Sequence, residues 1–123
     1  MTGVQTCALP ILKETPSKSV DLCSAYGVFV YLDTMVTFSY LKDSVRCLKE
    51  NGYLYFDILD MDREDMVEVI DRTIVNCNYL IPISKRLVVQ YLGELGMQLA
   101  TQFRPSDVAD ISTYLLFRKT RHP

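Results

Sequence analysis

The chain has 123 residues, of which 49% are hydrophobic and 23% are charged, and its formal net charge is −2. These proportions are typical of one globular domain of ordinary size and exclude a disordered segment. The near-neutral charge gives no electrostatic reason to expect nucleic acid or an anionic membrane as a partner. No apolar run approaches the roughly 20 residues that span a bilayer.

The first residues of the chain, Met1 to Ile11, resemble translated sequencing-library adapter and not native protein. The end of a widely used short-read adapter translates as Ala-Leu-Pro-Ile, which is the sequence of residues 8–11. The bases upstream of it translate as Thr-Gly-Val-Gln-Thr-Cys, which matches residues 2–7. We therefore expect the native protein to enter this chain near Leu12, and the chain to be the C-terminal part of a longer one.

A short strand and a helix are predicted at the start of the native part. Residues 12–18 read as a polar loop, and residues 20–25 as a strand. Asp33 or Thr34 can cap the N-terminus of a helix, because apolar residues recur beyond them at helical spacing as far as Leu48. We expect Gly52 to end this helix, since glycine tolerates the left-handed conformation that follows a helix.

Residues 53–59 (YLYFDIL) form a near-continuous apolar run, which is typical of a strand buried on both faces. With the preceding strand and helix they make one βαβ unit, so residues 20–25 and 53–59 are expected to be parallel neighbours. Asp57 places a carboxylate where the run should be apolar. It indicates either a polar role at the rim of a pocket or a cap for the next segment.

The second half of the chain is predicted to contain two helices and a hairpin. One helix begins within the acidic residues 60–71, and residues 73–82 are irregular. Ser84 is expected to cap a second helix that Gly96 ends. The apolar face of that helix is predicted to be Leu87, Val88, Tyr91, Leu92 and Leu95. Residues 97–103 and 111–119 read as an antiparallel hairpin, whose last strand should lie beside residues 53–59.

The acidic residues 60–71 imitate the start of a calcium-binding loop. Asp65, however, stands where that loop needs glycine, and Asp71 stands where it needs glutamate. An acidic helix N-terminus, which the helix dipole favours, explains the run without a metal ion.

The cysteines and the single histidine exclude several kinds of site. Cys7 belongs to the adapter-like stretch, and Cys23, Cys47 and Cys77 lack the C-x-x-C spacing of a zinc site. We interpret these three as reduced, buried thiols of a cytoplasmic protein. Because His122 is the only histidine, no His-based nucleophile pair or metal cluster can be built inside the chain.

The order of these elements, together with four stretches of sequence, resembles the C-terminal half of class I S-adenosylmethionine-dependent methyltransferases. Residues 20–32 are similar to the family's F-D-L-V … G-V-L-H-H-L segment, and residues 46–54 to its R-V-L-K-P-G-G-x-L segment. Residues 80–97 resemble the helix before its sixth strand, and residues 113–119 its closing strand. The resemblance implies an α/β fold with a truncated doubly wound, Rossmann-like sheet, mostly parallel with a C-terminal antiparallel hairpin.

The resemblance also implies where a site would lie. The family holds its cofactor mainly through a glycine-rich loop in its first half, and no G-x-G cluster occurs in this chain. The segment after the family's fourth strand lies beside the methionine end of the cofactor, which makes Tyr26 and Gly27 candidate cofactor contacts. A turn at Gly27 and packing of Tyr26 are the alternative.

Three further residues are candidates for the substrate pocket: Phe29, Tyr31 and Asp57. Aromatic faces suit apolar substrates and sulfonium cations, although packing against the following helix explains Phe29 and Tyr31 equally well. Val30 and Tyr31 replace a frequent His-His pair of the family, which argues against an acid–base role at these positions.

Two functions of different classes follow. The first is a fragment, residues 12–119 with a tail at 120–123, of an S-adenosylmethionine-dependent methyltransferase that acts on a small molecule. Such a fragment would be inactive alone, would not bind the cofactor, and could self-associate through the edge of residues 20–25. The second is a small α/β binding or interaction module without catalysis. The sequence indicates no catalytic residue, substrate or methylated atom.

Deletion of residues 1–11 is expected to change the free energy of unfolding by less than about 1 kcal/mol. Sequence that was never selected together with this fold has no reason to complement its surface. Denaturant titration of the full and shortened chains measures the difference. A larger loss on deletion would show that the segment makes specific contacts and would contradict its origin as adapter.

Overall fold

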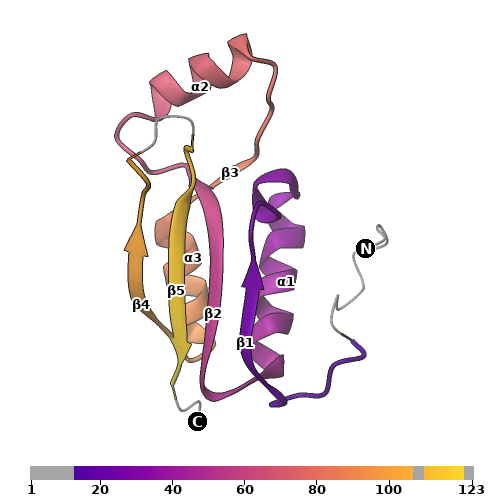
Figure 1. Ribbon diagram of the computed structural model, residues 1–123. Coiled ribbons are helices and arrows are strands. Elements are labelled where there is room, and N and C mark those ends of the chain that lie inside the picture. The colour runs from indigo at the N-terminus through magenta and orange to yellow at the C-terminus, as the bar shows by residue number, and fades with distance from the viewer. Residues whose placement is uncertain (1–12, 107–109, 121–123) are drawn as a thin grey trace.

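A mixed β-sheet with helices on one face makes up the computed structural model, which describes residues 13–106 and 110–120 (Figure 1). Residues 1–12, including Cys7, and His122 lie outside the described residues, so the predictions made for them stay predictions. The elements in chain order are β1 (Val20–Ala25), the 3-10 helix η1 (Phe29–Tyr31), α1 (Thr34–Cys47), β2 (Leu48–Asp60), α2 (Met66–Val75), β3 (Pro82–Ile83), α3 (Lys85–Glu94), β4 (Met97–Phe103) and β5 (Thr113–Lys119).

The long strand β2 has strand neighbours on both edges, and the sheet order is β1-β2-β5-β4. β1 runs parallel to β2, with Leu22 opposite Tyr53 and Ala25 opposite Phe56. β5 runs antiparallel along the other edge of β2, and β4 is antiparallel to β5. β3 adds a short parallel pairing at the C-terminal end of β2. The predicted α/β class and the predicted neighbours of residues 53–59 are confirmed.

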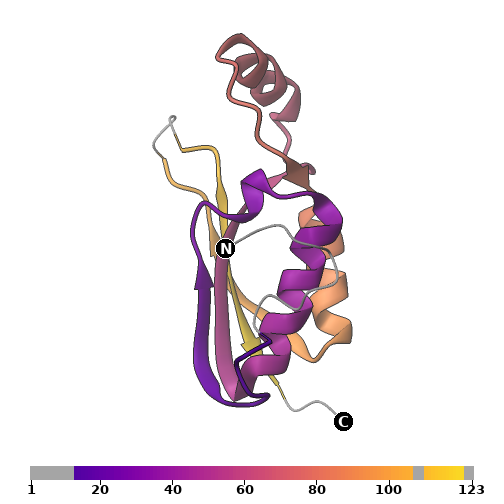
Figure 2. The same cartoon turned by 90° about the vertical axis from the view of Figure 1, so that its right-hand side faces the viewer.

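The hydrophobic core lies between the sheet and the helices α1 and α3, which cover the same face (Figure 2). Alternate residues of the central strands point toward these helices and are fully buried: Leu54, Phe56, Ile58, Leu115 and Phe117. Burial of each such side chain contributes about 2 kcal/mol to folding. The rings of Phe38 and Tyr91, 5.0 Å apart, join α1 to α3.

The opposite face of the sheet, which we call the open face, is not covered by any helix of the described residues (Figure 2). Leu22, Tyr53 and Phe103 lie on it and are 58%, 39% and 51% exposed. The prediction that residues 53–59 are covered on both faces is therefore wrong for the first half of the run. Side chains alternate along a strand, so the apolar residues that point away from α1 and α3 meet solvent.

α1 begins as predicted and ends earlier than predicted. The side chain of Asp33 accepts a hydrogen bond from the backbone N–H of Met35 at 2.9 Å, which confirms the N-cap. The helix stops at Cys47, and Gly52 already belongs to β2. The left-handed residue here is Asn51, with φ 69°. Gly52 serves close packing instead, because a Cβ atom there would lie 2.9 Å from the carbonyl oxygen of Lys49.

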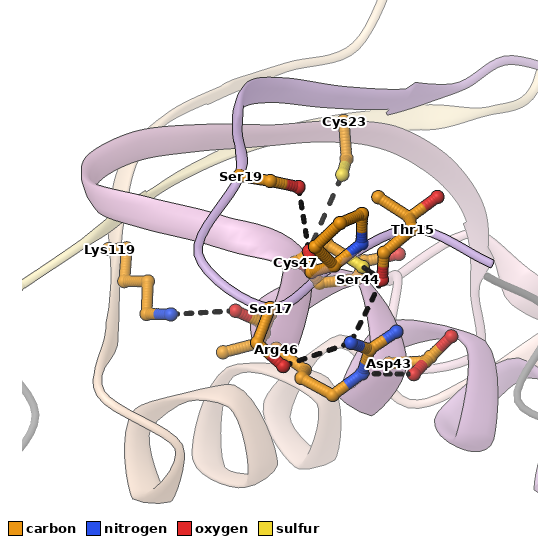
Figure 3. Close-up of polar contacts among 11 residues, drawn as sticks. Thr15, Ser17, Ser19, Cys23, Asp43, Ser44, Arg46, Cys47 and Lys119 are labelled. Carbon is orange, nitrogen blue, oxygen red and sulfur yellow. Dashed lines mark hydrogen bonds and ion pairs between the residues drawn. The ribbon is translucent and has the colours of Figure 1, made fainter. Parts of the chain in front are cut away.

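A buried lysine from the last strand closes the C-terminal end of α1 (Figure 3). Nζ of Lys119 donates to the carbonyl oxygens of Val45 and Leu48, both at 2.7 Å. Lys119 is only 5% exposed, and burial lowers the pKa of its ammonium group. The last carbonyls of a helix lack partners within the helix. The Lys119 side chain therefore adds a charged donor beside the backbone N–H of Leu48, which also donates to Val45.

A second set of contacts at the same end of α1 holds the loop before β1 (Figure 3). Nε of Arg46 donates to the carboxylate of Asp43 at 2.8 Å. Nη1 of the same side chain donates to the carbonyl oxygen of Thr15 and to Oγ of Ser17, each at 3.0 Å. The entry to β1 is thereby fixed to α1, although about thirty residues of sequence separate them.

The helices of the second half differ from the prediction in detail. α2 extends to Val75, so residues 73–75 are helical and not irregular. Oγ of Ser84 accepts from the backbone N–H of Leu87 at 3.2 Å, which confirms the predicted cap of α3. Gly96, with φ 90°, follows the end of α3 as predicted. Leu87 is 43% exposed and does not join the buried face of α3, on which Val88 and Leu92 lie.

The helix α2 has the expected acidic N-terminus, with Asp65 at its N-cap and Glu68 in its first turn, and two earlier acidic residues also stabilise α3. Oδ1 of Asp60 accepts from the backbone N–H of Lys85 at 3.1 Å, and Oδ2 of Asp62 accepts from that of Arg86 at 3.3 Å. Both carboxylates therefore serve the N-terminus of α3, where the helix dipole favours negative charge. Hydrogen bonds from Ser84 and Arg86 lower the pKa of Asp62.

The three described cysteines are free thiols in three different environments. Cys47 is buried and Cys23 is half-buried, and burial raises the pKa of each thiol. The prediction of burial is wrong for Cys77, which follows α2 in a left-handed conformation and is exposed. Among the described residues, no helix combines the length and the apolar composition that crossing a membrane requires.

Substitution of Lys119 by Met is expected to lower the free energy of unfolding by about 2 kcal/mol, because two carbonyl oxygens at the end of α1 lose a charged donor. Lys49→Met is the matched control, since Lys49 is half-exposed and lies 3.7 Å from the carboxylate of Asp21. Denaturant titration followed by circular dichroism measures both variants. Equal stabilities of the two variants would show that the buried contacts of Lys119 contribute nothing.

Candidate functional site

Three strands begin or end side by side at one end of the sheet, the end at which β2 finishes. The parallel strands β1 and β2 end there, and the antiparallel strand β5 begins there. In open α/β sheets, ligands bind outside the carboxyl ends of the parallel strands. Tyr26 and Gly27 follow β1, Asp57 lies near the end of β2, and Ser112 directly precedes β5.

A buried carboxylate links these three strand ends. Asp57 is 2% exposed, and its Oδ1 accepts from the backbone N–H of Gly27 at 2.8 Å. Its Oδ2 accepts from Oγ of Ser112, also at 2.8 Å. Both carboxylate oxygens thus have partners, which a buried charge requires. Asp57 does not cap the next segment, the alternative left open by the sequence, but holds the loop after β1 against the start of β5.

The backbone conformation explains the glycine at position 27. Gly27 has φ 67°, in the left-handed region that side chains disfavour. No atom lies within 4 Å of where a Cβ would stand, so the space beside it is open. The conformation presents its N–H to Asp57 and turns the chain from β1 into η1. Gly27 therefore makes the turn that the sequence analysis gave as the alternative to a cofactor contact.

A hollow of about 390 Å³ lies beside this linkage. Four of the five predicted site residues line it: Tyr26, Gly27, Tyr31 and Asp57. The loop before β3 and the start of β5 complete its wall with Asn78, Leu80, Asp110, Ile111, Ser112 and Tyr114, and η1 adds Val30. The structure thus brings together residues from four separate parts of the chain, and their roles in binding remain predictions.

Phe29, the fifth predicted site residue, does not line the hollow. It is 5% exposed, and its ring meets Phe56 at 5.5 Å and Tyr40 at 6.3 Å in edge-to-face geometry. The short helix η1 turns Phe29 into the core and Tyr31, which is 60% exposed, outward. For Phe29, packing is therefore the correct interpretation.

Tyr114 is the central aromatic residue of the site, and the sequence did not single it out. Its ring stacks on those of Tyr26 at 6.2 Å, Tyr55 at 6.2 Å and Phe103 at 4.9 Å. Its hydroxyl donates to Oδ2 of Asp110 at 2.8 Å. Burial, reinforced by this hydrogen bond, raises the pKa of the Tyr114 hydroxyl above its ordinary value.

Ser112 and Tyr114 could have been found from the predicted topology. An antiparallel last strand beside residues 53–59 must begin at the edge where that strand ends. The polar residues at the start of the last strand therefore belong to the same edge as Tyr26 and Asp57. The pattern of the last strand by itself predicts only its place beside residues 53–59.

The chemistry of the hollow favours a neutral or cationic ligand. Its described lining contains two carboxylates, three tyrosine rings and no lysine, arginine or histidine. Tyrosine faces and carboxylates attract positive charge. Within residues 13–106 and 110–120, no cluster of three or more His, Cys, Asp or Glu side chains could hold a metal ion. The arrangement can position a ligand, and it offers no cysteine or lysine as a nucleophile in the described lining.

Comparison with known proteins finds similarity in structure alone. No protein-family model and no curated protein sequence matches the chain. Among solved structures, magnesium protoporphyrin IX methyltransferase from Synechocystis PCC 6803, with bound SAH, superposes with a TM-score of 0.68 at 11% identity. An O-methyltransferase family protein from Burkholderia thailandensis gives 0.68 at 11% identity, and a SAM-dependent methyltransferase from Methanosarcina mazei gives 0.66 at 10%.

These superpositions cover most of this chain and only part of the others. They include 83%, 97% and 98% of this chain, in the order given above. The chain spans 46% of the Synechocystis protein, 35% of the Burkholderia protein and 67% of the Methanosarcina protein. At such low identity the likeness establishes the fold, and the described sheet is of the Rossmann-like methyltransferase type.

Proposed function

We propose that this chain is the C-terminal part of an S-adenosylmethionine-dependent methyltransferase domain that acts on a small molecule. The observation that carries the proposal is the hollow at the carboxyl ends of β1 and β2, in a sheet of the methyltransferase type. Four of the residues that the sequence made candidates line it: Tyr26, Gly27, Tyr31 and Asp57.

The lining suits the positively charged end of the cofactor. Tyr26 is 74% exposed and stacks on Tyr114, and both residues line the hollow. A sulfonium cation is attracted by such a face, by about 1 kcal/mol or more where water is excluded. Asp57 acts as a positioning residue, because it orients the Gly27 backbone and both of its oxygens are engaged within the protein.

The remaining wall suits a small acceptor molecule. Tyr31 and Leu80 supply apolar surface, and Asn78 and Ser112 supply polar groups that can orient an acceptor. When bound, the cofactor would supply a methyl group activated by the sulfonium. Methyl transfer then depends more on the alignment of donor and acceptor than on acid–base groups. The absence of cysteine and lysine from the described lining is compatible with this reaction.

A second function, a non-catalytic binding module, is supported by a different observation. The chain lacks a G-x-G loop, and its hollow is built from one side of the family's expected cofactor site. A module of this kind would bind a ligand or partner without S-adenosylmethionine. The two proposals differ in what they expect upstream of Leu12. The methyltransferase requires a strand and a glycine-rich loop there, and a longer chain would then bind the cofactor. The binding module requires neither.

The 123-residue chain alone is expected to show no binding of S-adenosylmethionine in calorimetric titration at micromolar concentrations. A longer chain that adds a strand and a glycine-rich loop upstream should bind it, because the loop supplies backbone donors for the cofactor. Failure of the longer chain to bind, or an upstream sequence without this loop, would favour the non-catalytic module. Micromolar binding by the 123-residue chain as a monomer would contradict a site divided between two halves.

Substitution of Asp57 by Ala is expected to lower the free energy of unfolding by about 2–3 kcal/mol, because the Gly27 N–H and the Ser112 hydroxyl lose their acceptors. Asp57→Asn keeps one acceptor oxygen and should cost about half as much. Asp21→Asn is the control, since Asp21 is an exposed residue of β1. Denaturant titration, with hydrogen exchange at the Gly27 amide, gives the comparison. Unchanged exchange at Gly27 in Asp57→Ala would show that the carboxylate does not hold this loop.

A further inference from the structure

Two carboxylates of the hollow are joined by one serine residue. The backbone N–H of Ser112 donates to Oδ1 of Asp110 at 3.0 Å, and its hydroxyl donates to Oδ2 of Asp57 at 2.8 Å. The remaining oxygens accept from two further neutral donors, the Tyr114 hydroxyl and the Gly27 N–H. In residues 13–106 and 110–120, the salt bridges are made by other carboxylates: Asp21, Asp43 and Asp65. Two negative charges are therefore held close together without a cation.

Two arginines lie near Asp110, and both serve another carboxylate. Arg63 and Arg104 line a neighbouring hollow together with Asp110. Arg63 donates to both oxygens of Asp65 and to the carbonyl oxygen of Ile111. The hydrogen bond from Arg63, with a smaller contribution from Arg104, lowers the pKa of Asp65. Like charges held together repel, so the two carboxylates joined by the serine favour a ligand that brings positive charge.

Asp110 is the carboxylate of this pair that a ligand can reach. Asp57 is 2% exposed, whereas Asp110 is half-buried and lines the hollow. Each carboxylate oxygen can accept a second hydrogen bond, so Asp110 can bind a ligand while it holds its protein partners.

Asp110 also lies away from the proposed cofactor contacts. It precedes β5, and β2 separates β5 from β1, so about two strand spacings, or roughly 10 Å, lie between Asp110 and the Gly27 end of the hollow. The same distance separates Asp110 from the outer edge of β1, where an upstream half would join the sheet. A ligand group that faces Asp110 therefore belongs to the methyl acceptor and not to the cofactor.

We propose that the methyl acceptor is a small amine and that Asp110 faces its nitrogen. This inference rests on the proposed methyl transfer. In that reaction the lone pair of the neutral nitrogen forms the new C–N bond, and the C–S bond breaks with its electron pair left on sulfur. The positive charge passes from sulfur to nitrogen, and the nitrogen then releases a proton to water. A carboxylate without a cationic partner stabilises this charge where it develops.

Other classes of acceptor fit the described lining less well. A carboxylate or phosphate would meet two negative charges and no lysine, arginine or histidine. A hydroxyl acceptor must give up its proton as it reacts, and the described lining has no histidine or lysine to take it. An amine attacks with its own lone pair. Leu80, Ile111 and the tyrosine rings supply apolar surface for the rest of such a molecule.

Titration of the 123-residue chain with three probes of similar shape, followed by the NMR signals of the Ser112 and Tyr114 amides, tests the proposal. The probes are 2-phenylethylamine, 2-phenylethanol and 3-phenylpropionate, each up to about 20 mM. At neutral pH the amine probe is protonated and carries the charge of the methylated product. It should bind with a Kd of about 1 mM, the alcohol about fivefold more weakly, and the carboxylate should cause no shift.

Asp110→Asn should weaken binding of the amine about fivefold, the effect of one half-exposed ion pair, and should leave binding of the alcohol unchanged. A merely structural role of Asp110 would change both affinities alike. Asp71→Asn, at an exposed carboxylate of α2 outside the hollow, is the matched control and should change neither. Circular dichroism verifies the fold of both variants, and the comparison of the three probes on the unmodified chain decides the proposal even where a variant fails to fold.

Equal affinities for the amine and the alcohol, binding of the carboxylate probe, or no shift at Ser112 with the amine would each overturn the proposal. An unchanged affinity for the amine in folded Asp110→Asn would overturn it as well. No cofactor takes part in these titrations, so their outcome is independent of whether a longer chain binds S-adenosylmethionine, and failure of the amine site is distinguished from failure of the proposed function.

Discussion

The pairing of β2 on both of its edges is the constraint on which the rest of the described structure depends. β1 and β3 lie parallel to it, and β5 lies antiparallel to it. A strand in this position exposes no backbone edge of its own, and its inward residues can be buried completely. The helices α1 and α3 are held over one face because both connect strands of this sheet. The site is located by the same constraint, since three strand ends converge where β2 ends.

A single buried carboxylate, that of Asp57, connects these strand ends by hydrogen bonds. Asp57 receives one hydrogen bond from the loop after β1 and one from the residue before β5. An apolar residue at that position would fit the strand equally well, and it would leave the Gly27 N–H without an acceptor. A polar residue within an apolar strand costs folding energy unless it is fully bonded. Its presence is therefore explained by the loop that it positions.

The two faces of the sheet have different roles: one supplies stability and the other supplies exposed surface for binding. The face under α1 and α3 supplies the stability of the described chain through its fully buried core. The open face carries exposed apolar side chains together with the stacked rings around Tyr114. Exposed apolar patches of this kind mark surfaces that interact with something else. The proposed methyltransferase site draws on this side of the sheet.

Short-range patterns in the sequence determined much of the fold. The alternation and length of apolar runs gave the strands, and the caps at Asp33 and Ser84 depend on residues within one helical turn. These patterns, with the family resemblance, also placed Tyr26, Gly27 and Asp57 near one edge. Such features are visible in the sequence because the interacting residues are close along the chain or repeat at a fixed period.

Only the tertiary structure decided which distant residues complete these elements. Where α1 ends, Lys119 from the last strand donates to the carbonyl oxygens of Val45 and Leu48. Phe29 and Tyr31 are both aromatic and only two positions apart, and the turn of η1 over the core buries one and exposes the other. Ser112 reaches Asp57 across more than fifty residues of sequence. These contacts depend on how the strands are ordered in space, and no local periodicity records that order.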